Sequence, residues 1–169
     1  KLGPNAIKRN IIVNSVSKSC CMTGWRVGFI YASHGLIKIL TAINSQSISN
    51  IPVIAQYAAI HAIKNESEIA DQICSELKEN VKKISYSLNK VYGINFIIPE
   101  SGMFCFVDFK KYILRYNFSS DVDFADYLLN EYGLVVIPGS VFGKPDFLRF
   151  SFGVSKINLK KIITIINKL

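Results

Sequence analysis

The 169-residue chain lacks any long apolar run, because Lys38 and Asn44 interrupt the best candidate. A helix that crosses a bilayer needs about 18 or more consecutive apolar residues, so we expect no membrane segment. No signal peptide precedes the first strand-like segment, and we expect a cytoplasmic location. The chain begins with Lys1 rather than Met, and its first nine residues show no core pattern. We therefore expect it to be part of a longer protein.

Residues that bind metals or form disulfide frameworks are also scarce. The four cysteines (Cys20, Cys21, Cys74 and Cys105) do not have metal-ligand spacing. The two histidines, His34 and His61, are too few and too far apart in sequence to indicate a zinc site. We expect reduced thiols and no bound metal.

The chain is basic, with a formal net charge of +8, and its basic residues are sixteen lysines and only four arginines. The lysines are spread along the chain, without a basic stripe or interleaved aromatic residues. A solvated lysine-rich surface accounts for this pattern better than a nucleic-acid interface does. Half of the residues are hydrophobic and 19% are charged, as is typical of a globular protein.

The pattern of apolar residues divides the chain into two halves. In the first half it predicts a buried strand over residues 9–16, a second strand over residues 25–32, and helices over residues 36–44, 52–63 and 66–92. In the second half it predicts strands over residues 95–98, 103–109, 134–137 and 147–152. It also predicts a helix over residues 122–131 capped by Ser120 and a helix over residues 156–168 capped by Ser155. The expected fold class is α/β for the first half and α+β for the second, with a long amphipathic helix between them.

Lys18 is the first candidate for chemistry. It follows the first predicted strand, in a loop that also contains Ser15, Ser17 and Ser19, and no carboxylate adjoins it in the sequence. A lysine amine that loses water contacts also loses part of its charge, and a neutral amine can react with a carbonyl group. The alternative is an ordinary loop lysine on the surface.

Arg26 and Arg149 are the other candidates, because each falls in an otherwise apolar predicted strand. The planar guanidinium group binds carboxylates and phosphates in a bidentate manner. Strand alternation predicts that Arg149 shares a face with Phe147 and Ser151, and that Arg26 shares a face with Gly28. The residues alone indicate sites for two anions and one carbonyl, or else two arginines at strand edges that reach solvent.

The segment SKSCCMTGWRVGF, residues 17–29, resembles the lysine motif of the class I aminotransferases. These are the aspartate aminotransferase-like branch of the fold type I enzymes that depend on pyridoxal phosphate. Four later segments also look like that family and follow in the same order, at residues 45–63, 99–109, 133–143 and 147–153. The resemblance therefore covers nearly the whole chain.

This resemblance implies a fold and a set of roles. Residues 1–92 would be the end of a large three-layer α/β domain that binds pyridoxal 5'-phosphate, including an inter-domain helix, and residues 93–169 would be a small α+β domain. Lys18 would bind the cofactor covalently and move the proton of the reaction. Arg26, helped by Ser15, would bind the cofactor phosphate, and Arg149 would bind the substrate carboxylate. The implied function is transamination between an amino acid and a 2-oxo acid.

The resemblance also implies partners and missing parts. The complete protein would be a homodimer in which residues 45–50 lie near the second subunit, with no nucleic-acid or membrane partner. The family's Asp that pairs with the pyridine nitrogen precedes the lysine by more than the 17 residues present here, so we expect the chain to be inactive alone. Three alternatives stay open: another fold type I activity such as a C–S lyase, the aminotransferase-like domain of a transcription regulator, and an inactive split-gene product. The residues present do not set the side-chain specificity.

Overall fold

The computed structural model describes residues 9–169, which form two compact units. The N-terminal unit extends to Cys74, and the C-terminal unit comprises Ser75–Leu169. This division falls inside a long helix, because the second half of that helix packs into the C-terminal unit. The resemblance to the family implies a domain boundary between residues 92 and 93, and this boundary stays a prediction.

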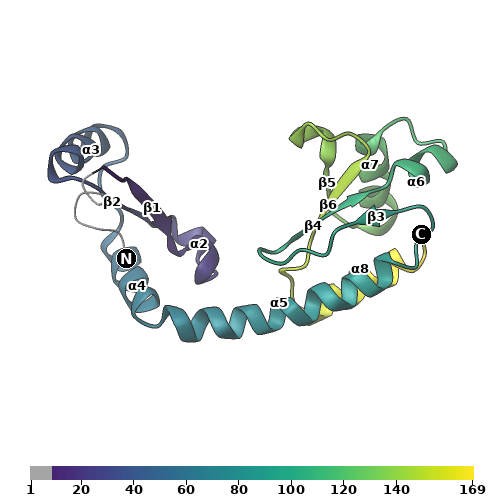
Figure 1. Ribbon diagram of the computed structural model, residues 1–169, viewed down its shortest axis with the longest axis horizontal. Helices are drawn as coiled ribbons and strands as arrows, with labels where there is room; N and C mark the ends of the chain where they lie inside the picture. The colour runs from purple at the N-terminus through teal and green to yellow at the C-terminus, as the bar shows by residue number, and fades with distance from the viewer. Residues whose placement is uncertain (1–8) are drawn as a thin grey trace. The chain divides into compact units, whose positions relative to one another are not determined.

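The N-terminal unit contains a two-stranded sheet, with short helical segments between its strands and two longer helices after them (Figure 1). Its elements are β1 (Ile12–Ser15), α2 (Val16–Ser19), the 3-10 helix η1 (Thr23–Trp25), β2 (Gly28–Tyr31), α3 (His34–Ser47) and α4 (Val53–Lys64). The strands β1 and β2 are antiparallel, and Ser15 lies opposite Gly28. The sheet therefore brings the two ends of the α2–η1 segment together.

The core of this unit is small and lies at one end of the sheet. It consists of Val16, Cys20, Val27 and three alanines of α4, Ala55, Ala59 and Ala62. The strands themselves are exposed, with exposed fractions of 71% for Val13 and 56% for Tyr31. The prediction of a buried first strand is therefore wrong for this chain: the strand is shorter than residues 9–16, and its apolar side chains meet no covering layer among residues 9–169.

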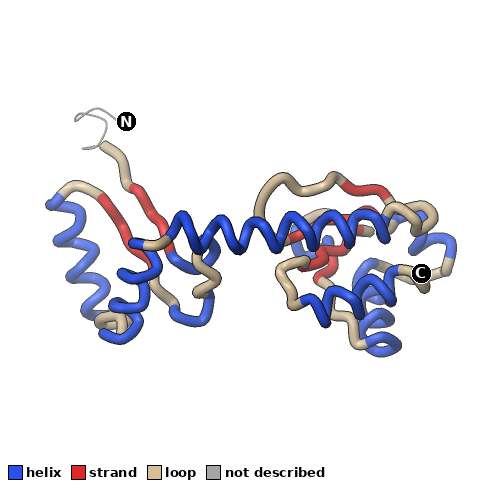
Figure 2. The backbone as a smooth tube through the Cα atoms, turned by 90° about the horizontal axis from the view of Figure 1, so that it is seen from below, coloured by secondary structure: helices blue, strands red, loops and turns tan. Residues whose placement is uncertain are grey.

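Helix α5 (Glu66–Leu88) is one continuous helix (Figure 2). The apolar stripe predicted from its sequence is buried in the second half, where Val81, Ile84 and Leu88 join the core of the C-terminal unit. The helix ends four residues earlier than predicted, before Gly93, which adopts a left-handed backbone conformation with φ of 77°. A glycine tolerates this conformation because it has no Cβ.

The C-terminal unit is an α+β arrangement built on a four-stranded antiparallel sheet with the order β3-β4-β6-β5 (Figure 1). Its elements are β3 (Asn95–Phe96), β4 (Phe104–Asp108), α6 (Lys110–Arg115), α7 (Asp121–Tyr132), β5 (Ile137–Pro138), the 3-10 helix η2 (Gly139–Phe142), β6 (Phe147–Ser151) and α8 (Lys156–Ile166). One face of the sheet is buried against the helices by Cys105, Val107, Leu148 and Phe150. The other face is partly exposed.

Local signals account for two helices of this unit. The hydroxyl of Ser120 accepts a hydrogen bond from the Asp123 N–H at 3.1 Å, and the hydroxyl of Ser155 accepts one from the Asn158 N–H at 3.3 Å. Both bonds satisfy backbone donors at helix starts, as the sequence predicts. The six-residue helix α6 was not predicted, and its N-cap residue Phe109 makes no side-chain cap bond. No helix among residues 9–169 is long and apolar enough to cross a membrane.

Candidate active site

Lys18 lies in the short helix α2, not in a loop as predicted. Ser15 caps this helix, since its hydroxyl accepts a hydrogen bond from the Ser17 N–H at 3.4 Å. Val16 and Cys20 anchor the turn in the core, and the Cys20 N–H donates to the Val16 carbonyl at 3.2 Å. Val16 and Cys20 are buried and the two serines beside Lys18 are half-buried, whereas Lys18 is the exposed residue of the turn.

Arg26 also differs from the prediction, because it lies outside the strand. The residues before it form the helical turn η1, in which the Trp25 N–H donates to the Met22 carbonyl at 3.2 Å. Arg26 then adopts a left-handed conformation with φ of 56°, and the extended backbone begins only at Gly28. Strand alternation therefore does not apply to Arg26, and the prediction that it shares a strand face with Gly28 is wrong.

The guanidinium group of Arg26 is available to a ligand. Its Nη1 atom donates to the Thr23 carbonyl oxygen at 3.2 Å, which orients the side chain over its own turn. Within residues 9–169 the structure records no other hydrogen bond or ion pair of this side chain. The side chain is exposed, so its remaining N–H groups face solvent. The left-handed conformation costs free energy in a residue other than glycine, and residues strained in this way are frequent at functional sites.

Ser15 completes a set of three polar groups on one segment. It lies directly opposite Gly28, and a Cβ atom at Gly28 would lie 3.3 Å from the Asn14 carbonyl oxygen and 3.7 Å from the Ser15 Cβ. A side chain at Gly28 would therefore press against the backbone next to Ser15. A hydroxyl, an amine and a guanidinium thus come from the continuous β1–α2–η1 segment, and this donor set suits a phosphate ester with a reactive carbonyl group.

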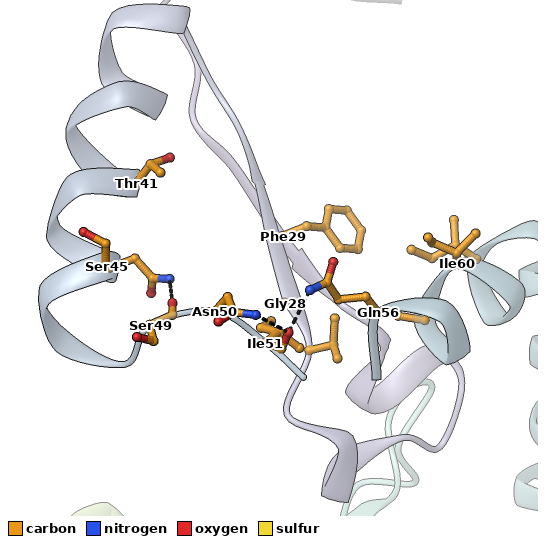
Figure 3. Close-up of a pocket in the computed structure, with 13 residues that line it drawn as sticks. Gly28, Phe29, Thr41, Ser45, Ser49, Asn50, Ile51, Gln56 and Ile60 are labelled. Atoms are coloured by element: carbon orange, nitrogen blue, oxygen red, sulfur yellow. Dashed lines mark hydrogen bonds between the residues drawn. The ribbon is translucent and has the colours of Figure 1, made fainter. Parts of the chain in front are cut away.

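The N-terminal unit also contains a pocket of about 620 Å³ beside β2, α3 and α4 (Figure 3). Hydrogen bonds hold the loop that lines it: the Ile51 carbonyl accepts from the Gln56 side chain at 2.7 Å and from the Asn50 side chain at 3.3 Å. One side of the pocket has Thr41, Ser45 and Ser49, and the other side has Phe29 and Ile60 together with the amide of Gln56. None of Ser15, Lys18 and Arg26 lines this pocket, so it is separate from the predicted cofactor contacts.

Arg149 belongs to the C-terminal unit and lies where strand alternation predicts. Its neighbours Leu148 and Phe150 are buried in the core, while Arg149 is on the partly exposed face of β6, opposite Phe106 of β4 and Ile137 of β5. The carbon Cζ of its guanidinium group lies 4.3 Å from the centre of the Phe104 ring and 4.7 Å from the centre of the Phe142 ring. Cations at this distance over an aromatic ring are attracted by the electrons of the ring.

The charge of Arg149 has no protein counterion in the described part of the chain. The one ion pair recorded for residues 9–169 joins Lys83 and Glu79, on the surface of α5. The Nε atom of Arg149 is buried and makes no hydrogen bond. A half-buried guanidinium group without a carboxylate partner is costly unless an anion binds to it. This arrangement favours an anion-binding role over a solvent-facing edge position.

Two further residues bear on the Arg149 site: Phe142, whose ring contacts Arg149, and Asp121, which contacts the turn that contains Phe142. Phe142 falls in the family-like segment of residues 133–143, and Asp121 falls just before the helix predicted over residues 122–131, so neither was named as a site residue. In the structure the Asp121 carboxylate is 3% exposed and accepts a hydrogen bond from the Ser140 N–H at 2.7 Å. No pattern in the sequence indicates this contact, because it joins segments 19 residues apart.

Comparison with known proteins identifies a family. The family described as aminotransferase class I and II matches residues 4–166. The chain is 34% identical over 158 residues to a probable aspartate/prephenate aminotransferase of Aquifex aeolicus, which covers 92% of this chain and 40% of the relative. It resembles the crystal structure of aspartate aminotransferase from Thermotoga maritima, with a TM-score of 0.75 and 30% identity over 96% of this chain and 40% of that one. It also resembles an aromatic aminotransferase from Pyrococcus horikoshii, with a TM-score of 0.81 and 25% identity over 99% of this chain and 44% of that one. The chain thus spans about 40% of the length of the curated relative.

Proposed function

Because the chain belongs to the class I and II aminotransferases, we propose that it is part of an enzyme that transfers an amino group between an amino acid and a 2-oxo acid with pyridoxal 5'-phosphate as cofactor. The observation that carries this proposal is Arg149: a half-buried guanidinium group without a protein counterion. Both substrate types carry a carboxylate that such a group can bind. Aspartate is the favoured amino acid, since the relatives from Aquifex aeolicus and Thermotoga maritima are named for it.

Three residues of the N-terminal unit would hold the cofactor. The cofactor supplies an electron-withdrawing ring that stabilises negative charge on the substrate. Arg26 binds the cofactor phosphate with the N–H groups that Thr23 does not use, and the Ser15 hydroxyl assists. The Lys18 amine holds the cofactor through its Nζ atom, and the same atom later takes the proton from the α-carbon of the substrate. The exposed position of Lys18 on α2 is consistent with this role.

The remainder of the active site would come from outside this chain. The apolar strand residues Val13, Phe29 and Tyr31 are 71%, 42% and 56% exposed. A globular domain covers such a surface with further chain, and the curated relative is more than twice as long. We therefore propose that the 169 residues are inactive alone, and that a cytoplasmic homodimer is the active form. Residues 45–50 would lie near the second subunit, and Ile48 in that segment is 77% exposed.

Arg149 provides the experiment that tests this function. In the complete enzyme, Arg149→Lys replaces a planar fork by a point charge, so we expect the KM for both substrates to rise with a smaller change in kcat. Arg115→Lys is a matched control, because Arg115 lies in the same unit, is exposed and also has its guanidinium group over aromatic rings, those of Tyr92 and Tyr116. An unchanged KM in Arg149→Lys would refute the carboxylate role. Elimination products in place of amino transfer would refute the transaminase reaction and support a lyase.

A further inference from the structure

Phe142 is held over Arg149 by two features of the fold. It is the last residue of η2, and its ring also meets the ring of Phe106 edge-on, with 6.1 Å between ring centres. Phe106 lies opposite Arg149 in the sheet. The position of the Phe142 ring therefore depends on the position of the η2 turn relative to the sheet.

The η2 turn is fixed at its first two residues. A Cβ atom at Gly139 would lie 2.2 Å from the Lys144 carbonyl oxygen and 2.6 Å from the Phe147 Cβ, so the backbone of Gly139 is in close contact with β6 and the segment before it. The next residue, Ser140, donates its N–H to the buried carboxylate of Asp121 at 2.7 Å. Asp121 is the first residue of α7, so this bond joins the turn to a helix packed in the core.

Asp121 does not act on Arg149 directly. No ion pair joins the two side chains in residues 9–169, and the guanidinium charge is therefore available to a ligand. A buried carboxylate is costly unless it is hydrogen-bonded, and the Ser140 N–H supplies such a bond. The contact between Asp121 and Ser140 thus fixes the turn without neutralising the arginine.

We propose that Asp121 is a positioning residue for substrate binding: it anchors η2 so that the Phe142 ring contacts the Arg149 guanidinium group and orients it toward a carboxylate. This inference rests on the proposed function for the identity of the anion. It assigns to Asp121 and Phe142 an effect on carboxylate affinity although neither donates a hydrogen bond to the ligand. An attraction between a ring and a partly exposed cation changes affinity by about two- to fivefold.

Nuclear magnetic resonance of the complete protein tests the proposal. The Nε–H signal of Arg149 is assigned as the one that disappears in Arg149→Lys, and its chemical shift reports the nearby rings. We expect this signal to move in Phe142→Leu and in Asp121→Ala. It should stay in place in Asp121→Asn, which keeps an acceptor oxygen, and in the control Asp126→Ala, which removes an exposed carboxylate from the same helix.

Titration with succinate, a simple dicarboxylate, provides the second measurement. Phe142→Leu and Asp121→Ala should weaken its binding about two- to fivefold, whereas Asp121→Asn and Asp126→Ala should not. A folded Asp121→Ala with an unchanged Arg149 signal would overturn the proposal. If Asp121→Ala does not fold, an unchanged signal in Phe142→Leu overturns it instead. Failure of the proposed function gives a different result, since succinate would then bind Arg149→Lys as well as it binds the unmodified chain.

Discussion

The side-chain amide of Asn80 donates a hydrogen bond to the carbonyl oxygen of Phe152 at 2.9 Å, although the two residues are 72 positions apart. The same amide donates to the Val154 carbonyl at 3.2 Å. Asn80 is 7% exposed on α5, and its two acceptors lie just after β6, in the segment that leads to α8. One buried side chain thus ties α5 to the end of the strand that contains Arg149.

Replacing Asn80 by leucine should therefore destabilise the C-terminal unit. The substitution leaves the carbonyl groups of Phe152 and Val154 without this donor, and we expect the free energy of unfolding to fall by about 1–3 kcal/mol. Urea denaturation followed by circular dichroism measures this change. The control is Asn89→Leu, an exposed position one residue past α5, which should change the free energy of unfolding by less than about 0.5 kcal/mol. Equal effects of the two substitutions would show that the Asn80 bonds contribute nothing.

Gly139 has no room for a side chain, so replacing it should destabilise the C-terminal unit. An added Cβ would lie 2.2 Å from the backbone oxygen of Lys144, a contact that only movement of the backbone can relieve. We expect Gly139→Ala to lower the free energy of unfolding by about 1–3 kcal/mol in the same urea experiment. Gly35→Ala is the comparison, because a Cβ at Gly35 in α3 meets nothing within 4 Å, and alanine favours a helix. A Gly139→Ala variant as stable as Gly35→Ala would contradict the close packing of η2.

Cys105 leads to a prediction about pH and reactivity. Burial raises the pKa of the Cys105 thiol to about 11, and the side chain is 1% exposed. At pH 8 only about one thousandth of this thiol is ionised, and the thiolate is the form that reacts with iodoacetamide. We expect the exposed Cys21 and Cys74 to be alkylated in the folded chain and Cys105 only after unfolding. Peptide mass spectrometry distinguishes these sites. If Cys105 were alkylated as fast as Cys74, the Cys105 thiol would not be buried.

The raised pKa of Cys105 makes the free energy of unfolding depend on pH. The folded chain holds the Cys105 proton more tightly than the unfolded chain, whose thiol has a pKa near the ordinary value of 9.0. The stabilising contribution is therefore complete below about pH 9 and is lost as the pH rises toward 11. Cys105→Ala removes this pH dependence, and comparing the two unfolding curves between these pH values measures it.

Sequence patterns predict features that depend on near neighbours. The caps at Ser120 and Ser155 follow from residues three positions apart, and the face of Arg149 follows from the two-residue period of a strand. The burial of the first strand could not be predicted, because it depends on which chain segments cover Val13 and its neighbours rather than on their apolar character.

In the candidate site, too, some features follow from the local sequence and others from contacts between distant segments. The segment of residues 17–29 and the order of the later motifs resemble the family, and the match to residues 4–166 confirms this prediction. Arg26 adopts a left-handed conformation just after a helical turn. Asp121 is held by a contact between α7 and η2. Neither of these has a local signal, so both required the structure.

Lys18 is the residue on which the proposed chemistry depends most, and one measurement tests it directly. The protein isolated from its source cells is treated with borohydride, which fixes pyridoxal phosphate to the amine that holds it, and the labelled peptide is then identified by mass spectrometry. We expect the label to lie on Lys18 and a Lys18→Ala variant to carry none. A label on another of the sixteen lysines, or an equal label in Lys18→Ala, would contradict this expectation.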